Sequence, residues 1–406
     1  MLSAEEDCPD AESVSTSVSL STLLSPLSNV SLIRFADDLE QPSQQTLFQL
    51  FTSTTLRQTF YPIEHCVDLP RSPNSDALSF SWLLQDKIFL HTILFSSTAI
   101  QDRLLDRPSS RLTHFHLRRT ISLLNQSLSQ SNSHENEALF HVILILAMIS
   151  GLWGDYDSTA IHLSGLQQIV RLRGGLDYLG RYPKLHFKLD RLALTWALGS
   201  GEVPNFFVGP VSWSPYFGAP LVADGDPLDA KLLGSIVDLR LQGTFSDLKR
   251  LVHLVNDHLA NGLRLDGLLF QDSLGSIQTR LVKLQNGLEA SDECIRLGML
   301  AFLSTTMQIP GGKFPYAYLT DKFRNSCKTF IMRTPARERL MFWLLVVGSI
   351  SVFEPDEPWL VSILAGLAAP QLSWEEARSR LQDVMWIDGL HEKMGLSAFS
   401  ELMHRT

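Results

Sequence analysis

The chain has 406 residues, of which 45% are hydrophobic and 19% are charged, and its formal net charge is −9. This composition is typical of a globular protein with a large buried core. It argues against a free-standing nucleic-acid binder, whose affinity depends on a surplus of Lys and Arg. Basic residues never run longer than two, as at Arg118-Arg119, so no basic cluster for nuclear import is visible.

The four cysteines are too widely separated to predict a zinc finger or a disulfide framework. They are Cys8, Cys66, Cys294 and Cys327, and none belongs to a CxxC pair. We therefore expect reduced thiols, as is usual in an intracellular protein, and no bound metal or other cofactor.

Residues 1–40 are predicted to form a disordered, Ser-rich, acidic tail. Two interpretations of this tail remain open. It is either a solvated extension or a short activation segment, because leucines at 20, 23, 24 and 27 follow its acidic start. Two later apolar runs, at 138–153 and 340–353, are shorter than the ~20 residues that a membrane-spanning helix needs. Both runs therefore predict buried core helices.

Residues 41–406 are predicted to form a large all-α domain of helical bundles and hairpins. Apolar residues recur at helical spacing, most clearly within residues 246–260, whereas alternating strand patterns are scarce. A long loop suggests two lobes, 41–198 and 228–406. The predicted helices span residues 44–60, 76–105, 111–129, 137–150, 158–173, 183–198, 228–239, 246–260, 265–286, 292–306, 321–331, 335–353, 357–367 and 374–390.

The stretch 137–180 predicts two helices joined by a sharp turn. Its first part is almost wholly apolar, which indicates a helix buried around most of its circumference. Gly151 and Gly154 interrupt this pattern, and Asp155 offers an oxygen to cap the next helix. Gly174-Gly175 suits the end of that second helix.

A recognisable pattern runs through this hairpin and returns near the end of the chain. It consists of Trp153, Gly154, Asp155, His162, Gly165, Leu166, Arg171, Arg173, Gly174, Gly175, Trp386 and His391. These residues resemble the signature of the fungal-specific transcription factor domain, an all-helical regulatory region that usually follows a binuclear zinc cluster. Residues 374–391 are similar to the closing helix of that family. The resemblance marks these residues as structural and implies no catalytic or ligand-binding role for them.

The resemblance implies a transcriptional regulator of RNA polymerase II genes in a fungal nucleus, which either stays there or shuttles with the cytoplasm. The family's zinc cluster needs six closely spaced cysteines, and this sequence does not contain them. Direct DNA binding by this chain is therefore doubtful, and zinc is expected only if a zinc cluster is encoded upstream. The expected partners are other regulators, a homo- or heterodimer partner, or a small effector. The alternative is a helical ligand-binding or scaffold protein without DNA-binding activity.

The loop 199–227 contains five glycines, five prolines and five aromatic residues. A loop of this length in a compact domain is unusual and is often functional. Its aromatic residues either staple the loop to the helices or line a pocket for an apolar effector. These residues are Phe206, Phe207, Trp213, Tyr216 and Phe217. Asp190, before the loop, also falls where family members carry a similar residue.

The sequence contains no recognised catalytic or metal-binding motif, such as HExxH, GxSxG or a phosphate-binding loop. The acidic group 37–40 predicts a solvated turn rather than a magnesium site. The histidines are expected to be exposed or satisfied by hydrogen bonds: His114, His116, His162, His253, His258 and His391. No catalytic residue is predicted, so the chain is not expected to be an enzyme.

Arg171 and Arg173 are the charged residues of greatest interest in the hairpin. With Asp155 and Asp157 they form ion pairs, or they bind an acidic partner. The negative end of the helix dipole already favours cations at this position.

Overall fold

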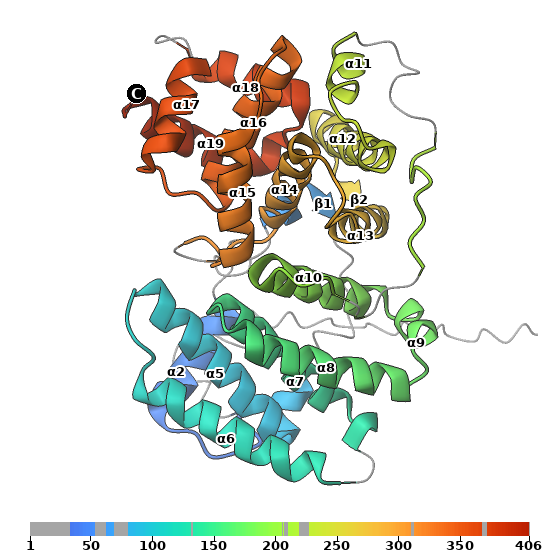
Figure 1. Cartoon of the computed structure of the whole chain (residues 1–406). Coiled ribbons are helices and arrows are strands. Elements are labelled where there is room, and N and C mark those ends of the chain that lie inside the picture. The colour runs from blue at the N-terminus through green and yellow to red at the C-terminus, as the bar shows by residue number, and fades with distance from the viewer. Residues whose placement is uncertain are drawn as a thin grey trace, which may run out of the picture.

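A computed structural model describes residues 33–52, 62–68, 80–130, 133–204, 206, 210–218, 227–309, 312–367 and 372–405. Nearly all regular structure in these ranges is helical, which confirms the predicted all-α class (Figure 1). No helix in these ranges is long and apolar enough to cross a membrane. Residues 1–32 of the predicted tail lie outside the described residues.

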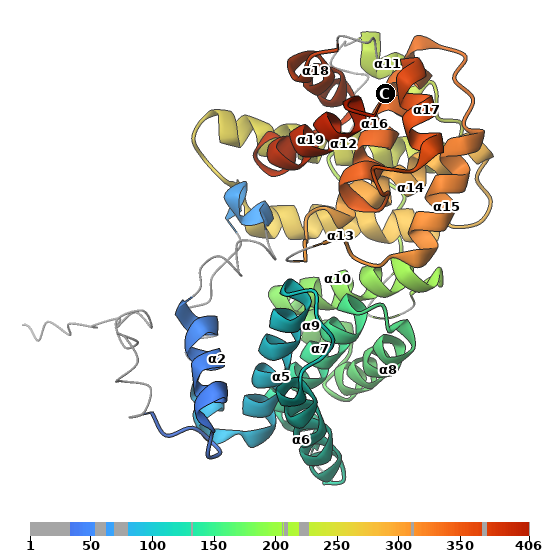
Figure 2. The same cartoon turned by 90° about the vertical axis from the view of Figure 1, so that its left-hand side faces the viewer.

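A first group of helices packs around an apolar centre. It comprises α2 (Gln41–Thr52), α5 (Lys87–Leu104), α6 (Arg111–Leu128), η3 (Ser133–Glu135), α7 (Glu137–Leu152), α8 (Tyr156–Leu172), α9 (Leu176–Gly180) and α10 (Pro183–Ser200). Helix α7 is buried on most sides, as its apolar sequence predicts. It packs against α5 and α8, while α6 covers the outer side of α5 (Figure 2).

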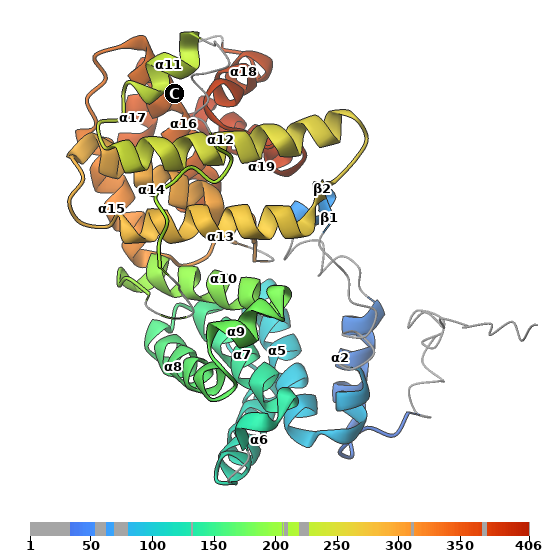
Figure 3. The ribbon, with the colours of Figure 1, turned by 90° about the vertical axis from the view of Figure 1, so that its right-hand side faces the viewer.

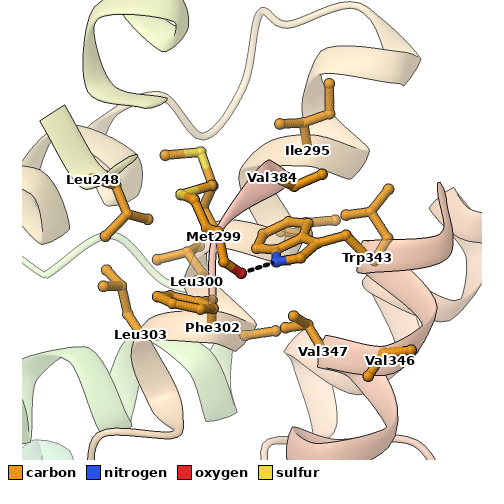
Figure 4. Packing of buried hydrophobic residues seen from close by; sticks show 14 of the residues in the cluster. Leu248, Ile295, Met299, Leu300, Phe302, Leu303, Trp343, Val346, Val347 and Val384 are labelled. Atoms are coloured by element: carbon orange, nitrogen blue, oxygen red, sulfur yellow. Dashed lines mark hydrogen bonds between the residues drawn. The ribbon is translucent and has the colours of Figure 1, made fainter. Parts of the chain in front are cut away.

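A second group of helices encloses a separate hydrophobic cluster. It comprises α11 (Pro227–Leu233), α12 (Leu239–Ala260), α13 (Gly267–Lys283), α14 (Ala290–Ser304), α15 (Ala317–Thr329), α16 (Pro335–Ser351), α17 (Pro358–Leu367), α18 (Trp374–Val384) and α19 (Asp388–Met403). The central helices α14 and α16 are buried on nearly all sides. Between them the rings of Phe302 and Trp343 lie 5.9 Å apart, and the Trp343 indole donates to the carbonyl of Met385 at 2.7 Å (Figure 4).

One early segment of the chain belongs to this second group. The short helix η2 (Pro62–His65) leads into strand β1 (Val67–Asp68), which pairs in parallel with strand β2 (Leu265–Asp266) (Figure 3). Ile63, Cys66 and Val67 are buried in the second hydrophobic cluster. This two-stranded pair is too short to show in the sequence pattern, and it ties the early segment to the start of α13.

Helix α10 lies between the two groups and contributes to both cores (Figures 1 and 3). Leu189 and Trp196 belong to the first hydrophobic cluster, whereas Leu194 and Leu198 belong to the second. The apolar residues of α10 therefore face in two directions, and this helix joins the cores.

Two predicted helices are broken by aspartates. Asp86 interrupts the helix predicted over 76–105, because its carboxylate caps α5 by accepting from Phe89 N–H at 2.8 Å. The predicted end of the helix over 228–239 is wrong, because the helix ends at Leu233. Beyond it, the buried carboxylate of Asp292 accepts from the N–H groups of Val237 and Asp238 at 3.0 and 2.8 Å. These bonds satisfy the backbone of the break before α12 begins.

The closing helix predicted over 374–390 is also wrong, because it is two helices separated by extended residues. Met385 has φ −164° and ψ 125°, and α19 begins at Asp388. The backbone of this break is held by the side chain of Asn256 on α12. Its Nδ2 donates to the carbonyl of Trp386 at 2.7 Å, and its Oδ1 accepts from the N–H of Asp388 at 3.1 Å. Distant side chains thus replace the helical hydrogen bonds, which no local sequence pattern indicates.

Replacing Asn256 with Ala should destabilise the protein by about 1–3 kcal/mol, because two backbone groups between α18 and α19 lose their partner. Urea unfolding measures the change. Asn261→Ala is the control, since that side chain bonds only to the exposed carbonyl of Asp257 at 2.7 Å at the end of α12. Equal losses in the two variants would contradict the role given to Asn256.

Candidate functional site: a cleft between the two helical groups

A cleft of about 470 Å³ opens where α9 and α10 of the first group face α13 of the second. Residues 210–212 of the long loop form a further wall. This volume lies within the range of small-molecule sites. Its polar lining residues are His186, Asp190, Ser212, Gln271, Asp272, Ser276, Thr279 and Arg280.

On the α10 side of the cleft, His186 and Asp190 lie one helical turn apart. The imidazole Nε2 and the carboxylate Oδ2 are 3.5 Å apart, and their side chains are 35% and 21% exposed. Burial raises the pKa of Asp190 to about 6, and the nearby His186 opposes this rise. The carboxylate is thus poorly hydrated, and a cation in the cleft would stabilise its charged form.

On the α13 side, two buried side chains carry polar atoms without a hydrogen-bond partner. Gln271 is 8% exposed and its Oε1 accepts no hydrogen bond. Arg280 is 1% exposed, and its Nη1 donates no hydrogen bond although its Nη2 reaches Asp247. Both residues line the cleft, but these two atoms are fully buried beside it, and unpaired buried polar atoms are rare in proteins.

Asp247 of α12 connects the cleft to the long loop. Its carboxylate accepts from Arg280 Nη2 at 2.7 Å and from the backbone N–H groups of Tyr216 and Phe217 at 2.8 and 3.2 Å. Arg250, one turn further along α12, donates to the carbonyl of Phe217 at 3.0 Å. The loop beside the cleft is therefore fixed through its backbone by charged side chains of α12.

The aromatic residues of the loop, predicted either to staple it to the helices or to line an effector pocket, are not among the residues that line the cleft in the described part of the chain. Phe206 packs edge-on against Trp196 of α10, with ring centres 5.3 Å apart. Trp213 lies under the guanidinium of Arg240 at 5.4 Å. Tyr216 and Phe217 contact each other, and Phe207 lies outside the described residues. The loop lines the cleft with Pro210, Val211 and Ser212 instead.

The signature residues of the turn between α7 and α8 make capping and packing contacts. Gly154 has φ +74°, and a side chain there would lie 3.2 Å from Pro315. Asp155 caps α8 by accepting from Ser158 N–H at 3.0 Å, as predicted. Trp153 is 37% exposed and packs on Phe95 of α5. The turn therefore connects the first group of helices to residues near Pro315.

The signature arginines do not form the ion pairs considered for them. No ion pair joins Arg171 or Arg173 to Asp155 or Asp157 in the described residues. Arg173 instead donates to the carbonyl of His134 at 2.7 Å and to the hydroxyl of Tyr178 at 2.7 Å. It thus ties the end of α8 to the start of α7 and to α9, while Arg171 is exposed.

The remaining signature residues of α8 lie around its end. Gly174 and Gly175 have φ +110° and +69°, and the N–H of Gly175 bonds to the carbonyl of Val170 at 2.8 Å, which completes the end of α8. Leu166 is fully buried, whereas Gly165 has open space around it. Burial lowers the pKa of His162, and Asp155 opposes this effect.

Of the signature residues near the end of the chain, His391 has hydrogen bonds to both of its ring nitrogens inside the second hydrophobic cluster. His391 is fully buried, and its Nδ1 accepts from the N–H of Ile387 at 3.1 Å. Its Nε2 therefore carries the proton and donates to the hydroxyl of Thr305 at 2.8 Å. Burial lowers the pKa of His391 to about 3. Trp386 packs on its ring, with centres 4.8 Å apart, and neither residue borders the cleft.

A second polar cluster lies between α2, α5 and α6. His91 and His116 face each other with their Nδ1 atoms 2.9 Å apart. Ser43 lies 3.0 Å from Nε2 of His116, and Asp37 lies 3.4 Å from Nε2 of His91. Asp37 also binds Lys87 and Arg119, which hold its pKa at about 2. The solvated acidic turn predicted over 37–40 is therefore wrong for Asp37.

The described residues contain neither a disulfide among their cysteines nor a metal-binding cluster. Cys66, Cys294 and Cys327 are free and buried, and burial raises the pKa of the Cys66 thiol to about 11. The sulfurs of Cys294 and Cys327 lie 3.8 Å apart. No group of three or more His, Cys, Asp or Glu side chains in these ranges is arranged to hold a metal ion.

The fold and the cleft define an all-helical domain with a polar cleft between two hydrophobic cores. Residues 24–200 match the family described as the fungal specific transcription factor domain. The resemblance found in the sequence is thus confirmed over residues 24–200, and the match suggests a role in transcription regulation. The match ends at α10, so the likeness of residues 374–391 to the family's closing helix stays a prediction. Comparisons with curated proteins and with solved structures find no match.

Of the cleft residues, only Asp190 was indicated by the sequence, through the family resemblance. His186 lies one turn earlier on the same helix, a spacing that marks a shared face. Gln271, Asp272 and Arg280 gave no signal, because α13 meets α10 only in the folded chain.

Replacing Asp247 with Asn should destabilise the protein by about 3–5 kcal/mol, because the buried Arg280 guanidinium loses its counter-charge. Urea unfolding checks this value. Limited proteolysis should show faster cleavage within 210–218, since the backbone of Tyr216 and Phe217 loses its carboxylate.

The double variant Asp247→Asn/Arg280→Met separates these two effects. It should recover most of the stability, because no buried charge is left unpaired, but it should not recover the protection of the loop. If the double variant is as unstable as the single one, the ion pair is not the source of the loss.

Acid should destabilise the protein through His116, whose pKa burial lowers to about 4. Its folded pKa lies below the unfolded value of about 6.5, so the unfolded chain binds the extra proton and stability falls as the pH drops from 6.5 towards 4. His116→Asn should reduce this slope by up to about 1.4 kcal/mol per pH unit in that window.

Urea unfolding at a series of pH values measures this slope. His404→Asn is the control, because His404 is exposed at the end of the chain. The role of His116 would be refuted if its variant kept the full acid slope of the unchanged protein.

Proposed function

We propose that the chain is a transcriptional regulator of RNA polymerase II genes that acts in a fungal nucleus and exchanges with the cytoplasm. The observation that carries this proposal is the match of residues 24–200 to the fungal specific transcription factor domain. The matched part includes the whole first helical group from α2 to α10. The proposal needs no enzymatic step.

The chain acts through partner proteins rather than by holding DNA itself. Its formal charge of −9 supports this, since binding to phosphates requires a cationic surface. The partner is another regulator or a second copy of the chain. No cofactor enters this proposal, and zinc would be present only with a zinc cluster encoded upstream.

The cleft is the site through which a small effector would act on this domain. One wall, α9 and α10, belongs to the matched region, and the opposite wall, α13, lies beyond it. A ligand that contacts both walls binds best to one arrangement of the two helical groups, so it shifts the population towards that arrangement. The partner protein then responds to this arrangement through the surface that it contacts.

The alternative is a helical ligand-binding or scaffold protein with no role in transcription. The same polar cleft and the negative charge favour it, because neither requires a nucleic acid. The two functions differ in where the protein accumulates and in whether it changes transcription when it is tethered to a promoter.

Fusion of the full chain to a heterologous DNA-binding domain tests the proposal. In a fungal host, the fusion should change the output of a reporter gene, upward for an activator and downward for a repressor. The tagged chain without the fusion partner should accumulate in the nucleus.

The DNA-binding domain alone, expressed at the same level by immunoblot, is the control for the reporter. A fusion that leaves the reporter at the control level, together with a strictly cytoplasmic tagged chain, would reject the regulatory function and leave the scaffold alternative.

A further inference from the structure

We propose that the outer face of α8 is a self-association surface, on which a second copy of the chain packs its own α8 in the antiparallel direction. The proposal rests on the proposed function, because it selects the second copy among the partners given there and assigns it a surface. It is carried by an exposed apolar stripe on α8 and by the opposite charges at the two ends of that stripe.

Two large apolar side chains of α8 point away from the core. Ile161 is 71% exposed and Leu172 is 59% exposed, whereas Leu163, Leu166 and Val170 of the same helix are buried. The two exposed residues are about three helical turns apart, so they lie on one line along the helix, opposite to the buried side chains. Figures 2 and 3 show α8 at the edge of the first helical group, with α7 and α10 on its inner side. A surface helix normally presents polar residues on its outer face, so this stripe is suited to a contact with another helix.

Gly165 leaves the middle of this stripe open. It lies within α8, about one turn after Ile161, and a side chain added there would meet no atom within 4 Å. The described part of the fold therefore does not require glycine at this position, although glycine weakens the interior of a helix relative to alanine. The absent side chain allows the backbone of a second helix to come close at this point.

The two ends of the stripe carry opposite charges. Asp157 lies eight residues before Gly165 and Arg171 lies six residues after it, and both residues are exposed. Neither forms an ion pair with a described residue. In an antiparallel pair that is symmetric about Gly165, each Asp157 comes level with Arg171 of the other copy to within about 3 Å along the helix. In a parallel pair like charges would meet instead, so the charges select the antiparallel direction and make the surface complementary to itself.

The apolar residues interlock in the same arrangement. Ile161 of one copy comes level with Gln168 of the other, beside the open position at Gly165. The isoleucine therefore fills the space that the glycine leaves. The paired stretch from 157 to 172 is about 23 Å long, which places the contact at the low end of protein interfaces. We expect a dimer in equilibrium with the monomer at micromolar concentrations.

Sedimentation equilibrium of the purified full chain tests the proposal. The average mass should rise from the 45.5 kDa of the monomer towards twice that value as the concentration increases from low micromolar to several hundred micromolar. High salt should weaken the association, because it screens the two ion pairs. A chain that stays monomeric over this range would overturn the proposal.

Gly165→Gln separates association from folding. An added Cβ meets no neighbouring atom and glutamine favours a helix, so the melting temperature should stay the same or rise. The dimer should nevertheless weaken about tenfold or more, because the two backbones can no longer come close. Ile161→Gln should weaken the dimer to a similar extent. Its matched control is Ile121→Gln on α6, where the isoleucine is 37% exposed, and this variant should leave the dimer unchanged.

An exchange of charges tests the direction of the pair. Asp157→Arg and Arg171→Asp should each weaken the dimer about tenfold or more, because like charges then face each other across the contact. The double variant Asp157→Arg/Arg171→Asp should recover the affinity, since it restores both ion pairs with their positions exchanged. Single variants that associate as tightly as the unchanged chain would refute the antiparallel contact.

Thermal unfolding of each variant shows whether it is folded, so a lost dimer is not mistaken for a lost fold. A dimer that persists unchanged in Gly165→Gln and Ile161→Gln, or that Ile121→Gln weakens to the same extent, forms elsewhere and refutes the surface. Sedimentation does not depend on the reporter. A chain that dimerises through α8 but leaves the reporter unchanged and stays in the cytoplasm would refute the proposed function alone, whereas a monomeric chain that changes the reporter would refute the self-association alone.

Discussion

Helix α10 is the element on which both halves of the molecule depend, because its apolar side chains pack into both hydrophobic clusters. Leu189 and Leu198 face different clusters. The close packing at the end of the helix leaves no room for a side chain at Gly199, whose Cβ would lie 2.0 Å from the ring of Tyr156. The hydroxyl of Tyr156 in turn bonds to the carbonyl of Pro315 at 2.9 Å. The position of α10, and with it one wall of the cleft, is therefore fixed from both sides.

The second helical group uses buried charges to connect helices that are distant in the sequence. Lys249 binds the carboxylate of Asp229 and the carbonyl of Asp383, which joins α12 to α11 and to the end of α18. Arg296 binds Glu293 at 2.6 Å and the carbonyl of Leu281 at 2.9 Å, which joins α14 to α13. A buried charge is costly unless it is fully paired, so each such group favours one arrangement of its neighbours over others.

Sequence periodicity predicts the type and rough extent of most helices here, because their apolar stripes are long and their caps are local. The hairpin of α7 and α8 is the clearest case, since Asp155 and Gly175 act within one turn of the chain. The breaks at 234–238 and 385–387 were missed because their hydrogen bonds come from Asp292 and Asn256, each more than fifty residues away. The cleft was missed for the same reason, because its walls come from distant parts of the sequence. Arg280 and Asp190 are ninety residues apart in the sequence, and each alone reads as an ordinary charged residue on a helix.

The signature of the family and the chemistry of the cleft occupy different parts of the molecule, and this separation has a physical basis. The guanidinium of Arg173, one of the charged signature residues, donates to the carbonyls of His134 and Asn136 and to the hydroxyl of Tyr178. These hydrogen bonds hold the hairpin together, so the Arg173 guanidinium is engaged within the protein rather than with a ligand. Arg280 differs because one branch of its fork is unsatisfied, and it lies on α13, beyond the region matched to the family. The matched region supplies one wall of the cleft, α9 and α10, and the opposite wall, α13, lies outside that region, so the matched region alone does not form the cleft.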